Sequence, residues 1–192
     1  MYLNRNKEQS ILLLYLENYT KQYYLREISK LTKIPLKTTQ SLVNYLEINK
    51  ILKSTTKGKN KYFKLNLENI QTKLYLLQTE IFKTSLFLQK YPMFKTFIKD
   101  LKNDDLIVAF GSFAKFSSNK DSDVDLLIVS NKKNKLPFHL LPYKTHQIEI
   151  SKISFLRAIE KKEILIKEIE ENHVILNNHS FYVNNLWRHY AE

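Results

Sequence analysis

Residues 106–130 read LIVAFGSFAKFSSNKDSDVDLLIVS, and this stretch decides the fold of the C-terminal half of the chain. The apolar run Leu106 to Phe110 predicts a buried strand, and Gly111-Ser112 predicts a sharp turn that opens a short helix. Val124 to Val129 predicts a second buried strand. Strand, turn, helix and strand therefore follow one another within 25 residues.

Two carboxylates, Asp123 and Asp125, stand two residues apart at the start of the second predicted strand. Side chains alternate between the faces of a strand, so both carboxylates point the same way. Two like charges held side by side are unfavourable unless a cation lies between them. The Gly111-Ser112 turn offers backbone N–H groups and a hydroxyl, which suit phosphate oxygens. The stretch thus predicts a phosphate site beside a divalent-metal site, which favours nucleotidyl transfer.

The order G-S-x-A, a spacer and S-D-x-D-L-L-I-V resembles the signature of the DNA polymerase β-type nucleotidyltransferase superfamily, especially its minimal, antitoxin-like prokaryotic members. The family often has a second glycine after G-S-x-A-x, where this chain has Phe116. The resemblance implies Mg²⁺ or Mn²⁺ as cofactor and ATP or another nucleoside triphosphate as substrate. It also implies that Asp123 and Asp125 are metal ligands that act in catalysis. The residues that it implies for holding the triphosphate are Gly111, Ser112 and Ser122.

Active members of that superfamily usually carry a third carboxylate on a neighbouring strand. Residues 146–151, HQIEIS, alternate like a strand, and Glu149 is the acid within them. Glu149 is therefore our candidate third catalytic carboxylate, although a glutamate on the exposed face of an edge strand is equally ordinary. His146 in the same segment is either close to the nucleotide or structural.

Composition limits the class of protein. The 192 residues are 43% hydrophobic, carry a formal net charge of +12 and contain no cysteine, which excludes disulfides and thiolate metal sites. No apolar run approaches the ~20 residues of a membrane span, and no signal-peptide pattern is present. We therefore expect a soluble cytoplasmic protein without a membrane partner.

The positive charge is concentrated at one end. Residues 1–66 hold 13 basic and 4 acidic residues, a net charge of +9, whereas residues 67–192 hold 18 and 15, a net charge of +3. A basic N-terminal portion indicates a polyanionic partner.

Residues 1–66 show the rhythm of three short helices and a hairpin. Helical spacing appears in 4–19, 25–32 and 35–48, and residues 51–65 predict a β-hairpin with its turn at 57–60. The order resembles a winged helix-turn-helix domain, which implies binding of double-stranded DNA. The implied contacts are polar residues of the third helix and basic residues of the hairpin: Lys37, Thr38, Gln40, Ser41 and Asn44, and Lys57, Lys59 and Lys61. A module for protein contact is the alternative.

Residues 67–90 predict a long helix without Gly or Pro. Apolar residues and one threonine recur at three- and four-residue steps, which predicts either a homodimer through residues 67–90 or a connecting helix packed on its own domains. The positions are Leu67, Ile70, Leu74, Leu77, Ile81, Thr84 and Leu88.

The predicted fold class is α+β with two domains. We assign 1–66 to a winged helix domain, 67–100 to a linker helix region and 101–192 to a polymerase β-like nucleotidyltransferase α/β domain. Toward the C-terminus we expect an amphipathic helix over 155–172 and a closing hairpin with strands at 174–176 and 181–183.

Two functions remain open. The first is an enzyme that transfers a nucleotide, AMP from ATP in the leading version, to a hydroxyl of a protein or RNA, with an antitoxin-like role toward a HEPN-type toxin partner and repression of its own operon. The second is a DNA-binding transcriptional regulator whose nucleotidyltransferase half is weak or inactive and binds nucleotide or a partner protein. A drug-modifying enzyme shares the motif, but such an enzyme gains nothing obvious from a DNA-reading module.

Overall fold

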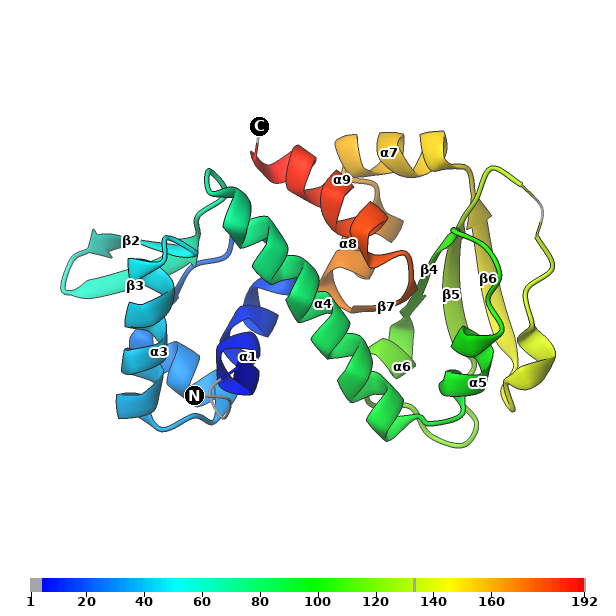
Figure 1. The fold of residues 1–192 in the computed structure, drawn as a ribbon, viewed down its shortest axis with the longest axis horizontal. Helices are drawn as coiled ribbons and strands as arrows, with labels where there is room; N and C mark the ends of the chain where they lie inside the picture. Colours follow the sequence, from blue (N-terminus) through cyan, green and yellow to red (C-terminus); the bar gives the residue numbers. More distant parts are fainter. Residues whose placement is uncertain (1–4, 133, 192) are drawn as a thin grey trace. The chain divides into compact units, whose positions relative to one another are not determined.

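The computed structural model describes residues 5–132 and 134–191 and divides into two compact units (Figure 1). Unit 1 comprises residues 1–79 and 190–192, and unit 2 comprises residues 80–189. The division falls within the long helix α4, Ile70–Lys90. Within the described residues, no helix combines the length and the apolar character needed to cross a membrane.

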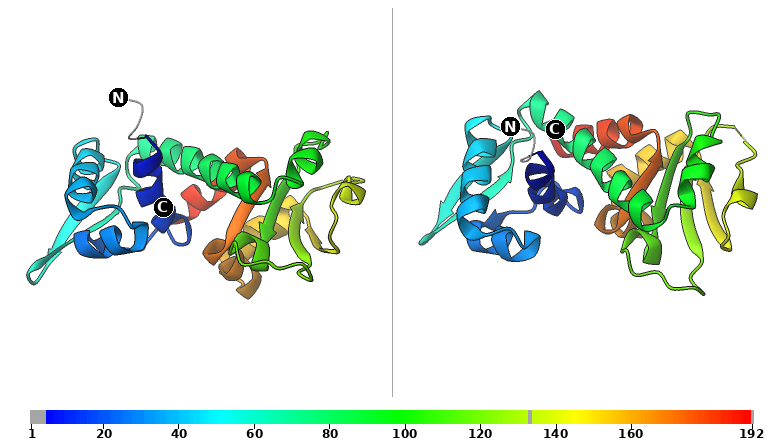
Figure 2. Two further views of the ribbon diagram at one scale, coloured as in Figure 1. Left: turned by 90° about the horizontal axis from the view of Figure 1, so that it is seen from below. Right: turned by 60° about the horizontal axis from the view of Figure 1, so that its bottom comes forward.

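Before α4 begins, the described part of unit 1 forms helices and a small antiparallel sheet. The helices are α1 (Arg5–Leu16), α2 (Leu25–Thr32) and α3 (Leu36–Ile48). The sheet has the order β1-β3-β2, from β1 (Tyr23–Tyr24), β2 (Leu52–Lys57) and β3 (Asn60–Leu65). The β2–β3 hairpin projects beyond the helices of this unit in every view (Figures 1 and 2). The helices and hairpin lie where the sequence predicted them, and β1 was not anticipated.

The core of unit 1 is apolar, with buried tyrosines at its edge. Ile11, Ile28 and Val43 are fully buried and bring α1, α2 and α3 together. The hydroxyl of Tyr15 donates a hydrogen bond of 3.0 Å to the carbonyl of Phe63, which ties α1 to β3. Burial of each large apolar side chain contributes about 1.5–3 kcal/mol, so this small core is sufficient to fix α3 and the hairpin.

Unit 2 is built on a four-stranded sheet of order β6-β5-β4-β7. Strands β4 (Leu106–Phe110) and β5 (Val124–Val129) pair antiparallel, and β7 (His173–Asn177) joins the other edge of β4, also antiparallel. Strand β6 (Thr145–Ile150) pairs with β5 in parallel. Every residue of β4 is buried, as expected of a strand covered on both faces.

One face of this sheet packs on aromatic residues of the second half of α4 and of α5, Phe94–Lys99. The rings of Phe87 and Phe94 lie 4.7 Å apart, and those of Tyr91 and Phe113 lie 5.0 Å apart. Apolar residues of the strands complete this core: Ile107, Ala109, Val124, Leu126, Val174 and Leu176. The core positions α6 (Gly111–Ala114), which follows β4 directly.

The C-terminal part of unit 2 differs from the sequence prediction in two places. The expected helix over 155–172 is two helices, α7 (Lys152–Glu160) and α8 (Ile164–Glu171), because Lys162 adopts a left-handed backbone with φ 51°. The expected strand at 181–183 is wrong, since His179–Ala191 forms helix α9. The side chain of Asn178 accepts the N–H of Phe181 at 3.2 Å and so supports the start of that helix. The 3₁₀ turn Phe138–Leu140 was not anticipated.

The predicted heptad positions of α4 have different surroundings along the helix. Ile70, Leu74 and Ile81 are exposed large hydrophobic residues. Thr84, in contrast, is buried and donates a hydrogen bond of 2.7 Å to the carbonyl of Ile175 in β7. The positions before 84 therefore keep an apolar surface, and a homodimer through this helix stays a prediction.

Candidate functional site

The turn at Gly111 and the carboxylate of Asp125 are in direct contact. Gly111 has φ +67°, a backbone region that favours glycine. A Cβ atom placed there would lie 2.2 Å from Oδ2 of Asp125, which is closer than atoms can approach. The conformation at this position thus favours glycine, the close approach of Asp125 requires it, and the Asp125 carboxylate lies against the N-terminus of α6. Ser112 follows in the first turn of α6, where backbone N–H groups lack partners inside the helix.

Phe116 adopts a backbone conformation that glycine favours. Its φ is 57°, a left-handed conformation that costs a residue with a side chain about 1–2 kcal/mol. The side chain of Lys90 donates a hydrogen bond to the Phe116 carbonyl, and the rings of Phe87 and Phe116 lie 6.2 Å apart. Packing therefore holds a phenylalanine in a glycine-like backbone conformation.

Asp125 lies in β5, and Asp123 comes directly before that strand, two residues away in the sequence. The Asp125 side chain is 30% exposed, and Asp123 is exposed. Burial raises the pKa of Asp125, the His146 imidazole opposes the rise, and the charges of Asp123 and Glu168 add to it. Two carboxylates this close repel each other, so a cation bound at this position would be stabilised.

His146 is the direct neighbour of Asp125 across the sheet. Strands β5 and β6 are parallel, and their register pairs Asp125 with His146. Paired residues of adjacent strands point to the same face, and Nδ1 of His146 lies 3.8 Å from Oδ1 of Asp125. The sequence could place His146 on a strand, but it could not supply the register that sets it beside Asp125.

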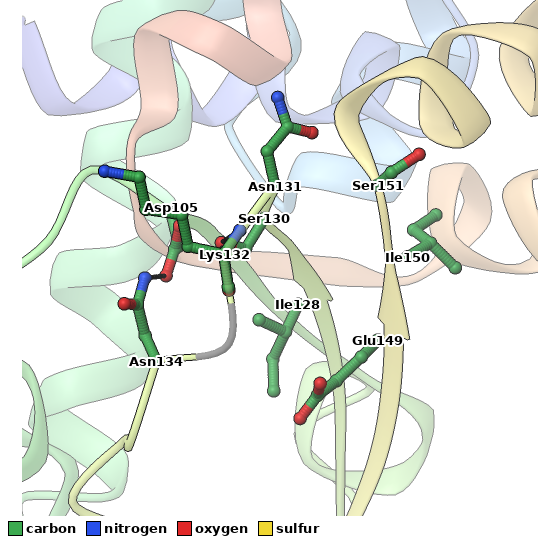
Figure 3. A pocket seen from close by; sticks show the side chains of 9 residues that line it. All are labelled: Asp105, Ile128, Ser130, Asn131, Lys132, Asn134, Glu149, Ile150 and Ser151. Atoms are coloured by element: carbon green, nitrogen blue, oxygen red, sulfur yellow. Dashed lines mark hydrogen bonds between the residues drawn. The ribbon is translucent and has the colours of Figure 1, made fainter.

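Glu149 does not join the two aspartates. The register pairs it with Ile128, three residues beyond Asp125 and on the opposite face of the sheet. Its side chain instead lines a cavity of about 210 Å³ at the far ends of β5 and β6 (Figure 3). In that cavity Asn134 donates a hydrogen bond of 2.7 Å to Asp105. The structure thus separates Glu149 from the rest of the predicted catalytic set.

Ser122 belongs to the spacer loop before the aspartates. Its hydroxyl accepts the backbone N–H of Asn119 at 2.9 Å and donates to the side chain of Asn119 at 3.1 Å. Both functions of this hydroxyl are therefore used within the loop. A hydrogen bond from Ser122 to a phosphate oxygen would therefore replace the bond that this hydroxyl donates to Asn119.

The side chains of this site fit a metal ion that arrives with a nucleotide. Among the described residues, no group of three or more His, Cys, Asp or Glu is arranged to hold a metal. Asp123 and Asp125 offer two carboxylates, and Mg²⁺ at nucleotide sites is commonly bound by one or two carboxylates together with substrate phosphates. The donor set therefore suits a metal ion whose remaining ligands are phosphate oxygens and water.

The predicted DNA contacts of unit 1 lie on its surface. On α3 the side chains of Lys37, Gln40, Ser41 and Asn44 are exposed and that of Thr38 is half-buried. The core-facing residues of α3 are Thr39, Leu42, Val43 and Leu46, so the polar residues occupy the opposite side of the helix.

The basic residues of the hairpin are also exposed, but they differ in their partners. Lys59 lies in the tight turn between β2 and β3, and the ammonium of Lys57 lies 5.7 Å from the ring centre of Tyr62. Lys61 forms an ion pair of 2.7 Å with Glu47 of α3. Lys61 therefore connects the hairpin to α3, and its charge is partly neutralised.

Comparison with known proteins identifies part of unit 2. Residues 92–181 match the model of the family described as nucleotidyltransferase domain. This segment contains the Gly111 turn and both aspartates, and it covers a little less than half of the chain. The chain therefore contains a nucleotidyltransferase domain. No curated protein and no solved structure matches the chain.

Proposed function

We propose that the protein is a nucleotidyltransferase that moves AMP from ATP to a hydroxyl of a protein or an RNA. The single observation that supports it most is the contact between the Gly111 turn and the Asp125 carboxylate, within a segment that matches the nucleotidyltransferase domain. In that contact, backbone N–H groups suited to phosphate would lie next to a carboxylate suited to a phosphate-bound cation.

In the proposed reaction the acceptor hydroxyl oxygen bonds to the α-phosphorus of ATP. The bond from that phosphorus to the β-phosphate oxygen breaks, pyrophosphate leaves, and the hydroxyl proton passes to solvent. Gly111 and Ser112 would orient the triphosphate, and Asp123 and Asp125 would bind Mg²⁺ or Mn²⁺. The bound ion would supply charge neutralisation for the phosphates. The contribution of the chain itself is positioning, which accounts for much of the rate in phosphoryl-group chemistry.

The test is incubation of the purified protein with α-labelled ATP, divalent metal and cell extract. Transfer of label that disappears in Asp123→Ala and Asp125→Ala supports the enzyme. Asp121→Ala is the matched control, because Asp121 is an exposed acid of the same loop and its backbone N–H, not its carboxylate, bonds to Asn119. Loss of transfer in this control as well would point to damage of the loop rather than of the site.

The second candidate is a regulator whose nucleotidyltransferase half binds nucleotide without transferring it. The position of Glu149 on the opposite face of the sheet favours it, because the two aspartates then lack a third carboxylate from β6. Binding of labelled ATP without transfer to any component of the extract would select this candidate.

We also propose that unit 1 binds double-stranded DNA. Its element order resembles a winged helix domain, the outer side of α3 is polar, and the hairpin turn carries lysines. In this docking α3 enters the major groove and the hairpin contacts phosphates. Gln40→Ala should abolish sequence-specific retardation of operator DNA in a gel, whereas Lys59→Ala should weaken binding to all sequences. Lys7→Ala on α1 is the matched control and should change neither.

An antitoxin-like role would combine the two activities. The acceptor would then be a HEPN-type toxin, a small helical ribonuclease encoded by the neighbouring gene, and unit 1 would repress the shared operon. Co-expression of the two proteins, followed by mass measurement of the partner, tests this. A mass increase of one AMP that depends on Asp125 supports the role, and an unmodified, unbound partner contradicts it.

A further inference from the structure

The position of His146 suggests a role in the nucleotide site. Its side chain is 87% exposed and faces Asp125 from the adjacent parallel strand. Of the β6 residues on this face, Ile148 and Ile150 are apolar and cannot bind a cation. The imidazole of His146 on β6 therefore lies beside the carboxylate of Asp125, which contacts the Gly111 turn.

The distance between the two side chains is informative. The 3.8 Å between Nδ1 of His146 and Oδ1 of Asp125 exceeds the 2.7–3.2 Å of an N–H···O hydrogen bond. Two donors that each lie about 2.1 Å from one metal ion are about 3 to 4 Å apart. The pair is therefore spaced for a shared ion rather than for direct bonding to each other.

We propose that His146 binds the same divalent ion as Asp125, and that the resulting carboxylate–imidazole site takes Mn²⁺ in preference to Mg²⁺. The inference rests on the proposed function and deepens it. Mg²⁺ selects oxygen ligands in a nearly ideal octahedron, whereas an imidazole nitrogen increases the affinity for transition metals. The identity of residue 146 would then set the metal preference of the reaction.

The experiment measures metal binding directly and does not depend on turnover. The full chain, with its histidines labelled with ¹⁵N, is mixed with Mn²⁺ and α,β-methylene-ATP, which cannot be cleaved between the α- and β-phosphorus. Pulsed electron paramagnetic resonance then shows whether a ¹⁵N nucleus is bonded to the manganese, and the label distinguishes histidine from adenine nitrogen. We expect a ¹⁵N coupling in the wild type that is absent in His146→Ala.

Affinities provide the second measurement. By calorimetry, His146→Ala should weaken binding of Mn²⁺ in the presence of the analogue by about 10- to 100-fold and change binding of Mg²⁺ by less than about twofold. His146→Asp should restore an all-carboxylate site and reverse the preference toward Mg²⁺. His139→Ala is the matched control, since His139 is an exposed histidine of the same unit outside the site.

The outcomes separate the inference from the proposed function. Manganese bound without ¹⁵N coupling, unaffected by His146→Ala but lost in Asp125→Asn, overturns the role of His146 and leaves the transferase proposal standing. If manganese binding were in addition lost in Glu168→Gln, the carboxylate of Glu168 in α8, rather than the imidazole of His146, would be the further ligand of the ion. If the wild type binds neither the ion nor the analogue, both proposals fail.

Discussion

Two carboxylate–imidazole pairs among the described residues of unit 2 differ in burial and in spacing. Glu80 and His173 are fully buried, and Nε2 of His173 lies 2.9 Å from Oε1 of Glu80. Asp125 and His146 are partly or largely exposed and lie 3.8 Å apart. The cross-strand register places both histidines in one row across the sheet, at opposite edges. The first pair is therefore closed within the protein, and the second is open to solvent.

The buried pair is joined by a hydrogen bond within the protein, whereas Oε2 of Glu80 has no hydrogen-bond partner among the described residues. Burial alone would raise the pKa of Glu80, but the charge and hydrogen bond of His173, with smaller contributions from Lys83 and His179, leave this pKa below its ordinary value. His173 directs its other ring nitrogen to the carbonyl of Ile169 at 2.9 Å. Groups with this many internal partners stabilise a fold, whereas groups without them are available for binding.

The largest expected effect is the removal of the buried carboxylate. Glu80→Ala leaves His173 buried without its partner and should lower the free energy of unfolding by about 3–5 kcal/mol. Urea denaturation followed by circular dichroism measures this. Glu80→Gln keeps the shape and a hydrogen-bonding group and should cost clearly less. A loss below about 1 kcal/mol in Glu80→Ala would mean that the pair is not structural.

Substitution in the exposed pair, Asp125 and His146, should affect activity and stability in opposite directions. Asp125→Asn should reduce nucleotidyl transfer by at least about 100-fold, since it removes a charge needed at the phosphates. The folded state raises the pKa of Asp125, so folding penalises the ionised carboxylate relative to the unfolded chain. The neutral amide should therefore raise the free energy of unfolding by up to about 1 kcal/mol after allowance for solvent screening. A variant that is inactive and also less stable would contradict the division of roles.

The pH dependence of stability should come partly from the surroundings of the buried pair. Burial lowers the pKa of His179, whose Nε2 lies 2.9 Å from the hydroxyl of Thr84. The unfolded chain therefore binds a proton below the ordinary histidine pKa of about 6.5 while the folded chain resists it. Stability should fall as the pH drops from 7.5 to 5.5.

His179→Gln should make that fall shallower, which denaturation at the two pH values would show. His139→Gln, on an exposed histidine, is the control and should keep the wild-type slope. Equal slopes in all three proteins would show that His179 does not cause the effect.

The smallest effect is expected at Phe116, in the loop beside the open pair. Phe116→Gly removes left-handed strain and also removes ring contacts, so the free energy of unfolding should change by less than about 1 kcal/mol. Transfer activity should be retained. Phe116→Val should be less stable than either, because a β-branched side chain resists a positive φ. Thermal denaturation ranks the three proteins, and a stable Val variant would show that the bend is not needed.

The sequence was sufficient for the elements whose signals are local. Strands 106–110 and 124–129 coincide with β4 and β5, and residues 25–32 coincide with α2. These segments combine continuous apolar runs or helical spacing with strong turn residues at their ends. The predicted strand at 181–183 was wrong because Phe, Tyr and Val favour strands locally. In the structure Tyr182, Val183 and Leu186 are instead buried together on one side of α9.

The candidate site was predictable only as far as one strand and its turn. Asp123 and Asp125 are two residues apart, so the alternation of side chains predicts that they point the same way. The contact of Asp125 with Gly111 depends in addition on the antiparallel pairing of β4 with β5. The partner on β6 depends on how β5 and β6 are aligned, with paired residues 21 positions apart in the sequence, and a shift of one residue exchanges the faces. That alignment places His146, not Glu149, beside Asp125.

The absence of a side chain at Gly111 has a practical consequence. The Asp125 carboxylate occupies the space that a Cβ would fill, so anything that pulls this carboxylate toward a cation must also change the packing of the turn. The amide protons of the first α6 residues thereby become natural reporters of occupancy. Their exchange with deuterated solvent would follow ligand arrival without any dye, label or turnover.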